Sequence, residues 1–138
     1  MKRSNRHFLP PLVASIALFA LMGLISCKED VQDTTDIVIP SKNVSYGKDI
    51  EPLFQRACAF SGCHDSESKA GAYSMETWWD VMSSKPGMVY AKDTANSVLV
   101  WTLIGKNNKA RMPFNRPALN ANQIHGINVW INEGAQNN

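Results

Sequence analysis

The sequence predicts an all-α fold, in which a small helical domain follows an N-terminal signal segment and a flexible tether. Apolar residues recur every three or four positions in several segments after residue 44, as they do on one side of an amphipathic helix. The alternation that marks a β-strand is weak, and there is no internal repeat. The chain has 138 residues, and the part that follows the signal and the tether is long enough for one small domain.

Residues 1–26 are expected to be a signal peptide. Lys2, Arg3 and Arg6 precede an apolar run, residues 12–25, that is short for a membrane span. An uncleaved anchor helix is the alternative, and the two prolines at its start disfavour it. Either interpretation places the domain outside the cytoplasm.

The signal ends in Leu-Ile-Ser-Cys at residues 24–27, which resembles the lipobox of bacterial lipoproteins. That resemblance implies cleavage before Cys27 and attachment of acyl chains to this cysteine. Acyl chains hold a protein on a membrane without a spanning helix. We therefore expect a lipid-anchored protein of the cell envelope, on the periplasmic or the surface face of the outer membrane.

Residues 27–43 are expected to form a flexible tether, because the stretch is polar, begins with an acidic run and has little to bury. Within it, Ile37-Val38-Ile39 is a short β-prone run that either docks on the domain or has no structural role. The domain itself is expected to cover residues 44–138.

The charge of the chain argues against nucleic acid as a partner. The formal net charge is +2, but three basic residues lie in the signal. The remaining 11 basic residues stand against 12 acidic ones, a net charge of about −1. No basic patch of the kind that binds phosphate backbones is visible in the sequence.

Three helices are expected in the first part of the domain. The first has Asp49 as its N-cap residue and ends before Cys58. The second covers residues 75–83, and a Lys-Pro-Gly sequence ends it. The third runs from about residue 94 or 96 to Ile104, although its continuous apolar run would also suit a buried strand.

The last helix has the clearest signals. Asn120 and Gln123 form a pattern like a capping box, and Gly134 stands where a C′ glycine ends a helix. Its buried side is predicted from apolar residues at helical spacing, namely Ile124, Ile127, Trp130 and Ile131. Residues 106–114, which precede it, are expected to form a loop.

Cys-Ala-Phe-Ser-Gly-Cys-His at residues 58–64 is the most informative stretch. Two thiols and an adjacent imidazole are what a c-type haem needs, since the thiols add to its vinyl groups and the imidazole binds the iron. Cys58 and Cys63 are thus candidate attachment residues, and His64 is a candidate iron ligand. The commonest spacing is C-x-x-C-H, and this chain has two more residues between the cysteines.

A haem iron needs a second axial ligand, and five residues are candidates for that role. Met75 and Met82 fit the apolar side of the second predicted helix and are assigned to the core, whereas Met88 remains possible. Met112 lies in a loop, where the following proline limits the freedom of the backbone. His125 is expected on the flank of the last helix.

From about residue 44 to residue 135 the chain resembles class I cytochrome c domains, and in particular the small cytochrome modules of extracytoplasmic bacterial lipoproteins. The matching pieces are residues 46–54, Cys63-His64, Arg111-Met112-Pro113, and residues 119–135. Two features depart from the family pattern: the wider cysteine spacing, and the lack of a proline soon after His64 to position the imidazole.

The resemblance implies a set of roles. Cys58 and Cys63 would carry one covalent haem c, with His64 as the proximal ligand and Met112 as the distal ligand. The first and last helices would cross, with Phe54 and Trp130 near the contact. The implied function is that of an electron carrier, not an enzyme, which exchanges single electrons with redox partner proteins. We expect an apolar wall around the iron, formed by Trp78, Trp79, Trp101, Phe114 and Ile127.

Three other interpretations stay open at this point. The first is a haem-free interaction lipoprotein of the same fold with a Cys58–Cys63 disulfide, and the second is a haem sensor whose distal ligand leaves to admit a gas. A zinc site is the third and fits less well, because adjacent Cys63 and His64 make awkward tetrahedral ligands. A hydrolytic enzyme is not indicated, since no nucleophile–base pair and no paired carboxylates are found.

Overall fold

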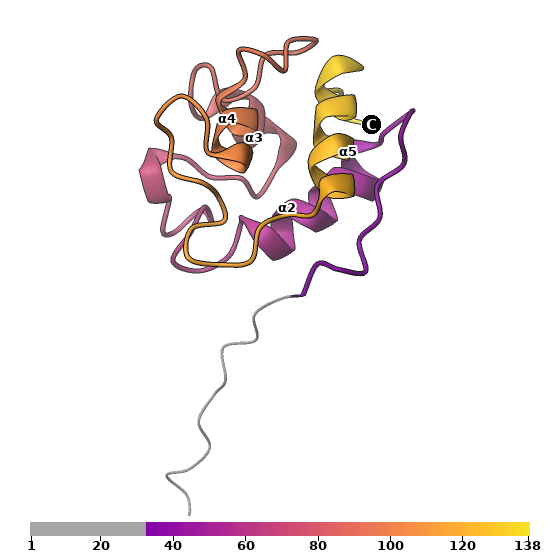
Figure 1. Ribbon diagram of the computed structural model, residues 1–138. Helices are drawn as coiled ribbons and strands as arrows, with labels where there is room; N and C mark the ends of the chain where they lie inside the picture. The colour runs from indigo at the N-terminus through magenta and orange to yellow at the C-terminus, as the bar shows by residue number, and fades with distance from the viewer. Residues whose placement is uncertain (1–32) are drawn as a thin grey trace, which may run out of the picture. The chain divides into compact units, whose positions relative to one another are not determined.

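Residues 33–138 are described by the structure, a computed structural model in which this part of the chain belongs to one compact unit (Figure 1). Its α-helices are α2 (Glu51–Ala57), α3 (Trp78–Ser83), α4 (Val98–Ile104) and α5 (Ala121–Asn132). A π-helical turn, Tyr46–Ile50, leads into α2, and a short 3-10 helix covers Ala70–Ala72. In the described residues, β-pairing is limited to one isolated bridge, Tyr90 to Asp93. The all-α prediction is therefore confirmed.

The first helical segment begins earlier than predicted. Ser45, not Asp49, is the N-cap residue, and its hydroxyl accepts a hydrogen bond from the N–H of Lys48. Asp49 supports the cap from inside the turn, because its carboxylate accepts the N–H of Ser45 at 2.8 Å. The two side chains thus satisfy backbone donors at the start of the segment in the manner of a capping box. Pro52 then lies in the first turn of α2, where it is tolerated.

The helices α3 and α4 begin later in the chain than predicted, whereas the start of α5 agrees with the prediction. Thr77 and Asp80 form a capping box that starts α3 at Trp78, so Met75 precedes the helix. The α4 helix starts at Val98 and ends at Gly105, which adopts the left-handed conformation. The predicted pair Asn120 and Gln123 does form the capping box of α5.

The first and last helical segments pack against each other through three aromatic rings. Phe54 of α2 meets Trp130 of α5 edge to face, with ring centroids 6.5 Å apart. The centroid of the Tyr46 ring lies 5.5 Å from that of the same indole. All three side chains are almost fully buried, which confirms the predicted contact of Phe54 and Trp130. Aromatic pairs of this geometry add to the free energy gained by burial alone.

Part of the predicted tether is packed on the domain (Figure 1). Ile39 is 2% exposed, and the side-chain amide of Asn122 both donates to its carbonyl oxygen and accepts its N–H. The amide of Gln123 donates to the carbonyl oxygens of Thr34 and Ile37. Placing the start of the domain at residue 44 was therefore wrong, because residues 34–39 are fastened to α5.

None of the helices within residues 33–138 is long and apolar enough to cross a membrane. The predicted signal peptide and the lipidation site at Cys27 lie outside the described residues.

Candidate functional site

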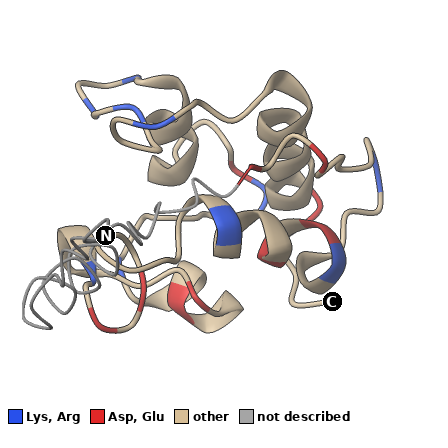
Figure 2. Ribbon diagram, turned by 90° about the horizontal axis from the view of Figure 1, so that it is seen from below, with Lys and Arg blue, Asp and Glu red and all other residues tan. Residues whose placement is uncertain are grey.

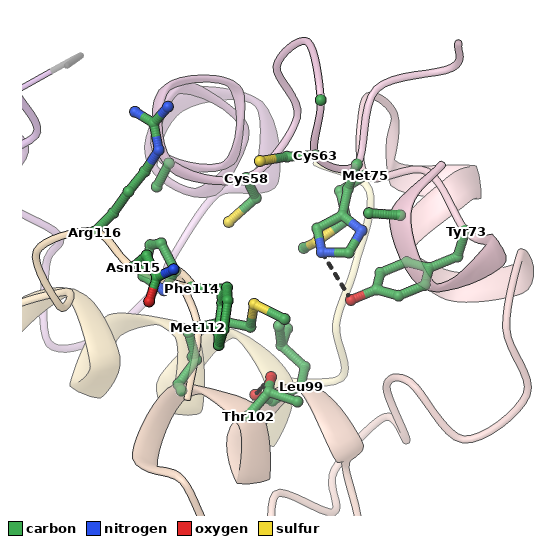
Figure 3. Close-up of a pocket in the computed structure, with 16 residues that line it drawn as sticks. Cys58, Cys63, Tyr73, Met75, Leu99, Thr102, Met112, Phe114, Asn115 and Arg116 are labelled. Atoms are coloured by element: carbon green, nitrogen blue, oxygen red, sulfur yellow. Dashed lines mark hydrogen bonds between the residues drawn. The ribbon is translucent and has the colours of Figure 1, made fainter. Parts of the chain in front are cut away.

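One cavity brings the four predicted site residues together. Cys58, Cys63, His64 and Met112 all line a space of about 360 Å³, a volume in the range of small-molecule and cofactor sites. Figure 3 shows the two cysteines on one side of this space and Met112 on the opposite side. Most of the remaining wall is apolar or aromatic, and it includes Ala57, Tyr73, Met75, Leu99, Leu103 and Phe114.

The loop between the cysteines is folded back on the end of α2. Cys58 is the C-cap residue of that helix, and its N–H donates to the carbonyl oxygen of Phe54. The N–H of His64 then donates to the carbonyl oxygen of Cys58 at 3.0 Å. Gly62 turns the loop with a φ of 82°, a left-handed conformation that glycine adopts without strain. The wider spacing is thus absorbed by a closed turn that returns His64 to the cavity.

Residues 70–75 run along this motif and are joined to it at both ends. The N–H of Ala70 donates to the carbonyl oxygen of Cys63, and the N–H of Met75 donates to that of His64. These two bonds hold Tyr73 and Met75 at the cavity wall. The place of Tyr73 at the cavity could not be predicted from the sequence, because no local pattern signals a pairing between a loop and a cysteine motif.

His64 is buried and held by Tyr73. The Tyr73 hydroxyl lies 3.2 Å from Nε2 of His64, and the two rings stack with centroids 4.2 Å apart. Nδ1 is buried and has no hydrogen-bond partner among the described residues. Burial lowers the pKa of His64, with the charge of Lys85 adding to the shift and the backbone of Ala70 and Tyr73 opposing it. His64 is therefore a neutral imidazole near neutral pH, which is the form that binds a metal.

The two cysteines differ in exposure. Both are free thiols in the structure, Cys58 buried and Cys63 half-buried. Burial, with a smaller contribution from the neighbouring Cys63, raises the pKa of Cys58 to about 12. Cys58 consequently stays a neutral thiol near neutral pH, and Cys63 is the more accessible of the pair.

Met112 reaches the cavity from the loop between α4 and α5. Its N–H donates to the carbonyl oxygen of Thr102 at 2.8 Å, which fastens the loop to α4. Met75 also lines the cavity, so assigning it to the core alone was incomplete. Met88 is buried away from the cavity lining, and His125 is exposed on α5 as predicted.

The predicted apolar wall is largely wrong. Only Phe114 lines the cavity, and at 62% exposure it stands at the mouth. The indole N–H groups of Trp78 and Trp101 donate to backbone carbonyl oxygens elsewhere. Trp79 is exposed, and Ile127 lies in the core between helices. Leu99 and Leu103, one turn apart on α4, form the wall instead, and their i, i+4 spacing was the available signal.

The metal-binding side chains that line the cavity fit a haem better than a bare metal ion. Within residues 33–138, no three His, Cys, Asp or Glu side chains gather closely enough to hold a metal ion. A haem iron takes four nitrogen ligands from the porphyrin, so the chain needs to supply only two. His64 and Met112 line the same cavity and are of the types that serve as axial ligands, and two thiols stand beside them.

Comparison of this chain with protein-family models, with curated proteins and with solved structures found no match. The chemistry of the cavity therefore carries the assignment of function.

Proposed function

We propose that this chain is a monohaem c-type cytochrome that relays single electrons in the cell envelope. The observation that carries the proposal is that Met112, which is distant in sequence, lines the same cavity as Cys58, Cys63 and His64. In this proposal the two cysteines hold the haem by thioether bonds, and His64 and Met112 are the axial ligands. The haem would supply the one-electron couple of ferrous and ferric iron.

The side chains around the cavity suit a relay rather than a catalyst. With both axial positions filled from the protein, no place is left for a substrate. The thioether sulfur of Met112 is a soft ligand and favours the reduced form. Leu99, Leu103 and Met75 are buried, and they present apolar side chains to this space. A dry, apolar surrounding also favours the reduced form, because it disfavours additional charge.

The positive charge of the loop that carries Met112 would suit a redox partner with an acidic surface. Lys106, Lys109, Arg111 and Arg116 lie on this loop, and no Asp or Glu occurs between residues 94 and 132. Figure 2 shows Lys and Arg gathered on the loop between α4 and α5 without any Asp or Glu. Phe114, exposed at the cavity mouth, lies among them. A positive loop at the mouth would guide an acidic partner to the place of electron exchange.

Acyl chains on Cys27 would tether the protein to the outer membrane, on its periplasmic or its surface face. The packed domain then begins close to the anchor, since residues 34–39 already belong to it. Such a tether keeps the carrier near partners in the same envelope.

The test is a pyridine haemochrome spectrum of the full chain, expressed with its signal in a host that has the cytochrome c maturation system. We expect one haem per chain that stays attached after denaturation. Cys58→Ser and Cys63→Ser should each remove one thioether bond and shift the absorption band, and His64→Ala should abolish stable incorporation. Ser61→Ala, an exposed change inside the same loop, is the matched control and should leave the spectrum unchanged. A colourless wild-type protein would refute the proposal and favour a haem-free module.

A further inference from the structure

The hydroxyl of Tyr73 lies beside Nε2 of His64, and both residues line the cavity. It stands 3.2 Å from Nε2, and the dashed line in Figure 3 marks this contact. The phenol ring stacks on the imidazole at an interplanar angle of 23°, and both side chains are 7% exposed. The amino group of Lys85 lies 5.2 Å from the centre of the Tyr73 ring and donates to the carbonyl oxygen of Gly71. Tyr73 is thus fixed by its neighbours as well as by His64.

The direction of this hydrogen bond follows from counting unsatisfied groups. If Nε2–H donated to Tyr73, the phenol proton would have no acceptor among the described residues, and Nδ1 of His64 would also be left without a partner. If Tyr73 donates to Nε2, only the Nδ1–H stays unsatisfied. Unsatisfied buried polar groups are costly, and the phenol O–H is a good donor to an imidazole nitrogen. The second arrangement therefore holds, and it keeps the proton of His64 on Nδ1.

We propose that Tyr73 is a positioning residue that keeps Nε2 of His64 unprotonated and therefore able to bind iron. Its hydroxyl donates to the lone pair of Nε2 and thereby fixes the Nδ1–H tautomer, so that Nε2 carries no proton. One lone pair can accept the Tyr73 proton or bind a metal, but not both, so the hydroxyl would have to turn away from Nε2 for iron to bind there. The last step rests on the proposed function, whereas the tautomer is a property of the chain itself.

Tyr73 also explains how the imidazole of His64 is oriented without the proline that the family pattern has after its histidine. The chain lacks a proline soon after His64 to orient the imidazole, and Nδ1 makes no hydrogen bond among the described residues. An imidazole ligand is normally oriented by a group on its second nitrogen. Here stacking on Tyr73 and the hydrogen bond at Nε2 orient the ring instead.

The experiment uses the full chain, ¹⁵N-labelled and expressed in a host without the maturation system. Two-bond ¹H–¹⁵N correlation spectra give the tautomer of each histidine, and the His64 signals are assigned by their loss in His64→Gln. We expect Nδ1–H in the wild type and a shift toward Nε2–H in Tyr73→Phe, which keeps the ring and loses the hydroxyl. Tyr46→Phe is the matched control, because Tyr46 is a buried tyrosine outside the cavity lining whose hydroxyl has no hydrogen-bond partner within residues 33–138. This control should leave the His64 signals in place.

An Nε2–H tautomer in the wild type, or an unchanged Nδ1–H tautomer in Tyr73→Phe, would overturn the proposal. Lack of covalent haem in the matured wild type would instead overturn the proposed function, so the two failures are distinguishable.

Discussion

Ile39 packs directly against the backbone of Gly126 in α5. A methyl group added at Gly126 would overlap the Cβ and Cγ2 atoms of Ile39. Both residues are buried, and Asn122 bonds the backbone of Ile39 one turn away on the same helix. The absence of a side chain at Gly126 is therefore what lets the segment before the domain lie on α5.

Gly126→Ala should destabilise the protein by about 2 kcal/mol, because the new methyl group overpacks the contact with Ile39. Helix propensity alone predicts the opposite sign, since alanine is better than glycine in a helix by about 1 kcal/mol. Urea unfolding of the single variants and of Gly126→Ala with Ile39→Ala measures the coupling between the sites. We expect the Gly126→Ala change to cost much less in the Ile39→Ala background. A Gly126→Ala protein more stable than the wild type would show that Ile39 does not pack there.

The stability of the protein without haem should fall as the pH is lowered through the range in which histidine ordinarily titrates. Burial lowers the pKa of His64 below its usual value near 6.5, so below that pH the unfolded chain binds a proton that the folded chain resists. Acid therefore favours unfolding, and the slope contributed by His64 is at most about 1.4 kcal/mol per pH unit. Urea unfolding between pH 7.5 and 5.5, in wild type and His64→Gln, isolates this contribution. Equal slopes in the two proteins would mean that the imidazole is not buried in its neutral form.

Met112→Ala should leave the haem attached but lower its reduction potential. Loss of the soft sulfur ligand removes a preference for the ferrous form, and a fall on the order of 0.1 V fits the roughly 0.8 V over which axial ligands move haem potentials. Potentiometric titration of the matured protein measures the change. Met75→Leu is the matched control, because Met75 lines the same cavity and leucine is a close substitute in volume. An unchanged potential in Met112→Ala, or an equal fall in Met75→Leu, would remove Met112 from the ligand set.

Charge on the loop between α4 and α5 should govern the rate of electron exchange. Lys109→Glu should slow oxidation of the reduced protein by ferricyanide on the order of tenfold at low ionic strength, because it replaces attraction of an anion by repulsion. The effect should fade as salt is added. Lys48→Glu makes the same change in net charge on an exposed residue outside the cavity lining and is the control. Stopped-flow traces with equal rates for the two variants would show that exchange does not occur at this loop.

The sequence by itself determined the local features of this protein. Periodicity predicted helices, and the pair Asn120 and Gln123 predicted the start of α5, because a capping box is a contact between residues three apart. The motif at residues 58–64 and the loop methionine at 112 were likewise found from residue types and their order. The predicted helices and the start of α5 are confirmed, because their physical cause lies within a few residues of chain.

The tertiary structure decided what depends on contacts between distant residues. Ile39 packs on the domain and is not part of a free tether, because Gly126 and Asn122 accommodate it on α5. The predicted tryptophan wall failed, because an indole needs both apolar surface and an acceptor for its N–H, and the backbone acceptors lie away from the cavity. Tyr73 reaches His64 only because a neighbouring loop pairs with the backbone of the motif. No local pattern carries such information, since each contact joins segments whose approach is set by the packing of the whole domain.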